Sequence, residues 1–179
     1  MHGPASSGWL LVALCALTGA YCLLRLRSSV AEQRRTAGAE AVMGFGMAAM
    51  AVPAAVLAPP RWAWALCAAV FAAAALRSLW TVRADPRHHL HHLVGSLAMV
   101  HMAVPMATGT HTGSAPLTGA LLLYFAGYVL WSGTRLVPAA VAAGADGGTP
   151  AAGWGDRPEL AQACRLSMGI AMVAMLLTL

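Results

Sequence analysis

Charged residues are scarce in this sequence, and lysine is absent. Asp, Glu and Arg together make up 9% of the 179 residues, whereas hydrophobic residues make up 59%. Soluble domains have roughly 25% charged residues, so this chain does not have the polar surface to cover a globule in water. A soluble enzyme and a disordered tail are therefore excluded. The eleven arginines lie in loops and at helix ends rather than on one face, which excludes a nucleic-acid-binding domain as well.

Paired cysteines are also lacking. Cys15, Cys22, Cys67 and Cys164 lie in or beside apolar stretches, and none of them forms a CxxC pair. We therefore expect no structural disulfide, and thiols that fill small apolar spaces. The segment 137–159 is rich in Gly, Pro and Ala, contains no nucleotide-binding motif and is typical of a flexible connector.

Long apolar runs, by contrast, are abundant. Six of them reach or approach the roughly 20 residues that cross a bilayer. They cover residues 9–26, 39–58, 62–81, 89–107, 117–136 and 160–179. None alternates apolar and polar residues as a barrel strand does, and helices satisfy their own backbone groups in lipid. We predict one all-α domain over residues 1–179, a polytopic bundle of six transmembrane helices.

The positions of the arginines predict how the chain is oriented in the membrane. No basic residue precedes the first apolar run and a basic cluster follows it, which indicates an anchor rather than a cleaved signal peptide. Ten of the eleven arginines flank the loops on one side, and Arg61 alone lies on the other. By the positive-inside rule, the arginine-rich side is cytoplasmic and both termini are extracytoplasmic.

An internal repeat connects the second, fourth and sixth apolar runs. The sequence GMAAMAVP at 46–53 resembles AMVHMAVP at 98–105, and AMVAMLL at 171–177 is a third, shorter copy. We therefore predict three helical hairpins in a pseudo-threefold repeat. The second, fourth and sixth helices would be central, and the first, third and fifth peripheral.

Every methionine after the initiator lies on those three helices. They are Met43, Met47 and Met50, then Met99, Met102 and Met106, then Met168, Met172 and Met175. Spacings of three and four place each set on one stripe of its helix. Such a stripe is also typical of ordinary core packing, because methionine fills irregular apolar gaps well.

If the three stripes face one another, their sulfurs form stacked rings. Met47, Met99 and Met172 would lie roughly 12–18 Å from the cytoplasmic end, near the centre of the bilayer. The second ring, one turn further out, would consist of Met50, Met102 and Met175. Because soft thioethers suit Cu(I), we predict a site for a soft metal ion, with Cu(I) as its suspected cofactor.

Polar residues gather at the cytoplasmic ends of the same helices. Under the repeat alignment, Glu40, His92 and Arg165 lie at one level, and His92 belongs to an HHLHH cluster with His88. In the copper hypothesis Met43, Met168 and His92 relay ions there, and Glu40 and His88 are further candidate ligands. The alternative is a polar belt beside anionic headgroups.

His101 lies in the middle of the fourth run, between two methionines of the stripe. An ionisable residue at that depth favours a functional role, and we count His101 among the candidate metal ligands. The alternative is a hydrogen bond to a neighbouring helix, with Ser96, Tyr124 or Ser132 as partner.

Two resemblances bear on function. The M-x-x-x-M pairs Met43/Met47 and Met168/Met172 resemble the pore motif of Ctr-type copper transporters, homotrimers whose Met triads face a central axis. That resemblance implies copper transport, storage or delivery, with a copper chaperone or another membrane protein as partner. Trp9 to Leu26 and the A-M-x-x-M-A-x-P repeat resemble a family of small actinobacterial multi-pass proteins known as a domain of unknown function. This second resemblance implies a bacterial plasma membrane and no particular activity.

Other functions stay open. A structural or regulatory subunit could dock a partner helix on the Met face. A haem-bearing electron-transfer protein would depend on His/Met ligation, since the histidines of the membrane region all lie on or beside one run. An intramembrane enzyme would draw on His88, His92, Glu40 and Asp85, which match no catalytic motif. We expect neither an enzyme nor a haem protein, and the lipid bilayer as the main partner.

Overall fold

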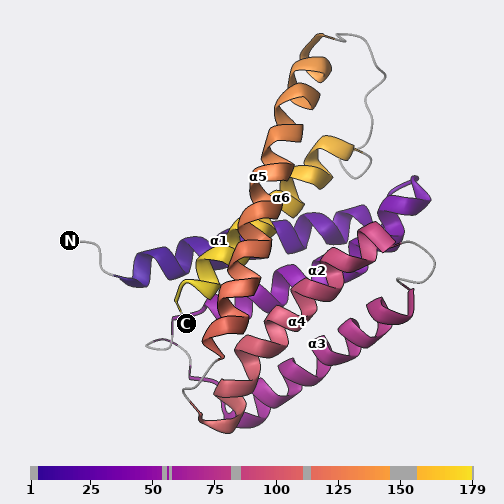
Figure 1. The fold of residues 1–179 in the computed structure, drawn as a ribbon. Helices are drawn as coiled ribbons and strands as arrows, with labels where there is room; N and C mark the ends of the chain where they lie inside the picture. Colours follow the sequence, from indigo (N-terminus) through magenta and orange to yellow (C-terminus); the bar gives the residue numbers. More distant parts are fainter. Residues whose placement is uncertain are drawn as a thin grey trace.

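A computed structural model of the chain describes residues 4–53, 56, 58–81, 86–110, 114–145 and 157–178. This part of the chain is all-α and consists of six helices (Figure 1). They are α1 (Pro4–Arg25), α2 (Ala31–Ala51), α3 (Arg61–Thr81), α4 (Pro86–Thr108), α5 (Ala115–Ala145) and α6 (Pro158–Leu176). The predicted helical class and the number of helices are confirmed.

Five helices are long and apolar enough to cross a membrane, namely α1, α3, α4, α5 and α6. The chain is therefore a multi-pass membrane protein by the length and hydropathy of its helices. The predicted span at 39–58 needs correction, because α2 begins eight residues earlier and ends at Ala51. Its first turns carry Arg34 and Arg35, and Glu40 follows, so α2 falls below the hydropathy of the other five.

The prolines of the repeat explain why α2 is shorter than predicted at its outer end. Val52, the residue before Pro53, has an extended backbone, at φ −60° and ψ 126°. Proline disfavours the helical conformation in the residue before it, so α2 ends there. In α4 the equivalent Pro105 stays inside the helix, which continues to Thr108 before Gly109 adopts φ 72°. The first two copies of the repeat therefore differ at their outer ends: the helix stops before Pro53 in α2 but continues past Pro105 in α4.

The segment predicted as a flexible connector from 137 also needs correction. Helix α5 continues through Pro138 to Ala145, nine residues beyond the expected end at 136. Five of its nine residues are alanine, which favours the helix. The rest of the predicted connector, 146–156, lies outside the described residues.

The helices pack as three hairpins, α1 with α2, α3 with α4, and α5 with α6, as the repeat predicts (Figure 1). In the first hairpin the backbones almost touch, because a Cβ atom at Gly44 would lie 2.9 Å from the Cα atom of Gly19. Further contacts join α1 to α6 and α2 to both α4 and α6. Helix α2 therefore links the hairpins.

The core consists largely of the methionine stripes. Seven methionines belong to one buried cluster, and Met50 packs against it. The seven are Met43, Met47, Met99, Met102, Met168, Met172 and Met175. Large apolar residues such as Leu123 and Leu130 of α5 and Trp62 of α3 are exposed instead, as expected for helix faces in contact with lipid. The Met faces of α2, α4 and α6 thus meet inside the bundle.

Candidate functional site

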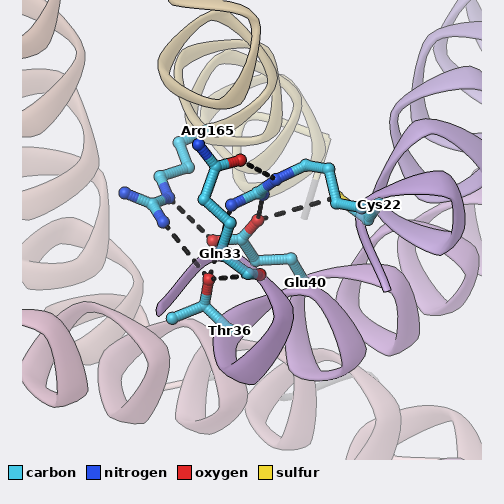
Figure 2. Close-up of polar contacts among 6 residues, drawn as sticks. Cys22, Gln33, Thr36, Glu40 and Arg165 are labelled. Atoms are coloured by element: carbon cyan, nitrogen blue, oxygen red, sulfur yellow. Dashed lines mark hydrogen bonds and ion pairs between the residues drawn. The ribbon is translucent and has the colours of Figure 1, made fainter. Parts of the chain in front are cut away.

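A buried carboxylate joins three helices at the arginine-rich end of the bundle. Glu40 of α2 and Arg25 at the end of α1 are both fully buried, and Arg25 Nη1 donates to Glu40 Oε2. Arg165 of α6 donates from Nε to Glu40 Oε1 at 2.7 Å. The Cys22 thiol also lies 3.7 Å from Oε2. Figure 2 shows these side chains converging from α1, α2 and α6. Each oxygen of the Glu40 carboxylate therefore forms an ion pair with one guanidinium group.

Two polar residues of α2 complete this network. Gln33 accepts a hydrogen bond from Arg25 Nε at 3.3 Å, and the Thr36 hydroxyl lies 3.5 Å from a terminal nitrogen of both Arg25 and Arg165 (Figure 2). Gln33, Thr36 and Glu40 follow at spacings of three and four, so they share one face of α2. The repeat alignment correctly placed Glu40 and Arg165 at one level. It missed Arg25. The sequence could have indicated this residue, because Arg25 lies at the end of the first apolar run and Glu40 is the single acidic residue of the second.

A cavity of about 360 Å³ lies next to this network, among α2, α4, α5 and α6. Four methionines line it, Met43 and Met47 from α2 and Met168 and Met172 from α6. Its polar lining includes Glu40, His91, His92, Gln162, Arg135 and Arg165. The structure therefore brings four of the predicted Met candidates together with Glu40 and His92 at one end of the bundle. The side chain of His88 lies outside the described residues.

His91 closes the gap between α4 and α5 on one side of this cavity. Its ring stacks on Tyr128, with 3.9 Å between ring centroids, and its Nδ1 lies 3.4 Å from the Tyr124 hydroxyl. The edge of its ring also meets Phe125, at 5.9 Å between centroids. These contacts hold the imidazole in one orientation.

A second cavity, of about 380 Å³, lies at the opposite end of the bundle. Four more methionines line it: Met50, Met102, Met106 and Met175. Leu11 of α1 and Trp64 of α3 complete its apolar wall. The outer methionines of all three stripes therefore meet in one place, as the inner ones of α2 and α6 do in the first cavity.

The middle of the stripes is closed to solvent. Met47, Met99 and Met172, the predicted central ring, are 0%, 0% and 2% exposed. Gly46 leaves room for the Phe71 ring and for Met99, since a Cβ atom at Gly46 would collide with that ring and lie 3.2 Å from the methyl carbon of Met99. Likewise, a Cβ atom at Gly95 would lie 3.0 Å from the methyl carbon of Met43. Gly95 stands where α4 would need the first Met of an M-x-x-x-M pair, and Met43 occupies that space.

His101 faces another helix. Its Nε2 lies 2.9 Å from the Thr118 hydroxyl of α5, and it is not among the residues that line the two methionine cavities. The structure thus gives His101 the neighbouring-helix partner that the sequence left open, although that partner is Thr118. Sequence reasoning missed Thr118 because it lies in the first turn of α5, outside the repeat.

In the described ranges, no three or more His, Cys, Asp or Glu side chains gather as a metal-binding group would. Four cysteines are present as free thiols in this part of the chain, as predicted. No metal site is evident from these ligand types. Any soft-metal site here would therefore depend on thioethers.

Comparison with known proteins gives a family but no activity. Residues 32–179 match the family model described as "Domain of unknown function (DUF5134)". No curated protein and no solved structure matches the chain.

Proposed function

The chain belongs to the DUF5134 family, a domain of unknown function, and we propose that this membrane protein binds a soft metal ion, with Cu(I) as the candidate, through the methionines of α2, α4 and α6. In this proposal α2, α4 and α6 are the central, equivalent helices of a pseudo-threefold repeat. The contacts of α2 with both α4 and α6 support that arrangement.

One observation carries the proposal. The methionine stripes line a cavity at each end of the bundle, and Met47, Met99 and Met172 are almost inaccessible to solvent; Met47 and Met172 line the first cavity, and Met99 lines neither. Thioethers bind Cu(I) well and bind Mg²⁺, Ca²⁺ or Zn²⁺ poorly, so a path with sulfur donors at successive levels selects for a soft ion. The same arrangement serves storage, delivery or transport of copper in a bacterial plasma membrane.

The polar end of the first cavity fits this role through nitrogen and sulfur donors rather than through Glu40. Both Glu40 oxygens are engaged by Arg25 and Arg165. The donors that line the cavity beside them are His91, His92, Met43 and Met168. We assign the relay of ions to these residues, and a structural role to Glu40.

Burial of the stripes bears on the other candidate functions. A partner helix cannot dock on Met47, Met99 or Met172 without opening the bundle, because these residues are almost inaccessible. For a haem group, His101 is a poor axial ligand, because its Nε2 lies 2.9 Å from the Thr118 hydroxyl. Both arrangements favour the soft-metal proposal.

The test is the copper content of the detergent-purified protein after anaerobic loading with Cu(I). We expect about one copper or more per chain in the wild type, since three thioethers complete a site for a monovalent soft ion. The variant Met47→Leu/Met99→Leu/Met172→Leu should bind almost none, because leucine preserves the volume but provides no sulfur.

The control is Met106→Leu: this methionine lines the second cavity, but it is 52% exposed and belongs to neither of the two predicted rings. It should bind as much copper as the wild type. A wild-type protein that binds no copper, or a triple variant that binds as much as the wild type, would contradict the proposal and leave the stripes as helix packing.

A further inference from the structure

A third hollow, separate from the methionine path, lies among α2, α3 and α4 at the arginine-rich end. Its volume is about 530 Å³. We call it the arginine groove. It shares Met43 and His92 with the first methionine cavity, and its remaining lining residues are its own.

The polar end of the arginine groove has one sign of charge. Arg34 and Arg35 from the first turns of α2 line it together with Arg77 from the end of α3. Ser78 and Ser96 add hydroxyl groups, and no acidic side chain is among the described residues that line it. The nearby carboxylate of Glu40 is bonded to Arg25 and Arg165 instead. This end of the groove therefore attracts an anion.

The rest of the groove is apolar and extends from the arginines toward the centre of the membrane. On α3 its lining includes Val70, Ala73, Ala74 and Arg77, which lie on one face at spacings of three and four, together with Phe71 and Ser78. On α2, Arg34, Gly38 and Val42 follow at spacings of four.

Small side chains keep this apolar part open. Around Gly38, the nearest atom to a Cβ would be Leu26 Cδ2, at 3.9 Å. Each wall thus leads from an arginine to small or apolar residues over about two turns.

We propose that the arginine groove binds one anionic phospholipid. The headgroup phosphate lies among Arg34, Arg35 and Arg77, and one acyl chain follows the apolar faces of α2 and α3. Guanidinium groups form charge-assisted, bidentate hydrogen bonds with phosphate oxygens, and basic pockets between transmembrane helices favour anionic headgroups. The groove and the first methionine cavity share Met43 and His92, but the lipid proposal rests on the arginines and on the apolar walls, not on copper binding.

The test compares two double variants of equal charge change in the full-length protein in detergent. Arg35→Gln/Arg77→Gln removes two arginines of the groove. Arg27→Gln/Arg157→Gln removes two arginines at the same end of the bundle that are outside the residues lining this groove. Each protein is titrated with dioleoyl-phosphatidylglycerol, dioleoyl-phosphatidylcholine or inorganic phosphate, and bound lipid is read by native mass spectrometry.

We expect the wild type to bind one phosphatidylglycerol in preference to phosphatidylcholine. The groove variant should lose about tenfold or more in affinity for phosphatidylglycerol, and the control variant less than about twofold. Ala74→Leu, which narrows the apolar part and keeps every arginine, should weaken lipid binding as well.

Three results would overturn the proposal. Equal losses in both double variants would indicate attraction by net charge rather than a site. Equal binding of phosphatidylcholine would remove the preference for an anionic headgroup. Inorganic phosphate that competes as well as the lipid, with Ala74→Leu without effect, would indicate a site for free phosphate. A groove variant that unfolds is replaced by Arg35→Lys/Arg77→Lys, which retains charge and loses bidentate geometry.

Discussion

The side chain of Glu40 joins three helices, because it accepts hydrogen bonds from guanidinium groups on two other helices. Removing one partner of a buried ion pair leaves the other charge without compensation, whereas removing both partners together can be nearly neutral. Arg25 is fully buried beside Glu40, and Arg165 is partly exposed. Arg25 is therefore the residue most affected by loss of the carboxylate.

At this scale we predict that Glu40→Gln lowers the free energy of unfolding by about 3–5 kcal/mol, because Arg25 then stays buried without a counter-charge. Thermal unfolding of the purified protein in detergent measures the change. Glu159→Gln, at an exposed position of the first turn of α6, is the matched control and should cost less than about 1 kcal/mol.

The double variant Arg25→Leu/Glu40→Leu separates charge compensation from packing. It should recover much of the stability that Glu40→Gln loses, since neither buried charge remains. If the double variant is less stable than Glu40→Gln, the network acts mainly through its hydrogen bonds to Gln33 and Thr36, contrary to this prediction.

At the scale of elements, the sequence predicted the helices and their pairing well and the helix ends less well. Spacings of three and four placed Met43 and Met47 on the buried face, and the repeat correctly predicted three hairpins. The ends depend on local exceptions. Pro53 ends α2 while Pro105 is accommodated in α4, and Pro138 lies inside α5. The repeat alone does not predict which of these prolines ends a helix and which one lies inside it.

The close contact between α1 and α2 gives a prediction at this scale. Gly44→Ala should destabilise the protein by about 1–3 kcal/mol, because its Cβ would meet the backbone of Gly19 rather than a side chain that can move. Gly127→Ala in α5, with nothing within 4 Å of its Cβ, should be neutral or slightly stabilising. Detergent unfolding midpoints of the two variants test this, and equal effects would contradict a backbone contact.

At the scale of the whole molecule, the number of crossings decides where the termini lie. Ser7 and Gly8 of α1 line the same cavity as Thr178 beyond the end of α6, so both ends of the described chain lie at one end of the bundle. This requires α2 to cross beside α1, although its hydropathy is below that of the other helices. Helix α2 can cross because its methionines and Glu40 make their contacts inside the bundle, away from lipid.

We therefore predict that reporter enzymes fused to the N- and C-termini lie on the same side of the membrane, outside the cytoplasm. Ten of the eleven arginines on the other side give the direction. Alkaline phosphatase activity at both fusion points tests this. A C-terminal fusion that is inactive while the N-terminal fusion is active would mean that α2 does not cross.

The ion pair between Glu40 and Arg165 joins residues that are 125 positions apart in the chain. During synthesis, α2 leaves the ribosome long before α6, and at that stage one oxygen of its carboxylate has no guanidinium partner. A charged residue in a membrane segment opposes insertion by the translocon. Helix α2 therefore depends on the much later helix α6 for its final place, and the early hairpin becomes secure only after α6 has been made.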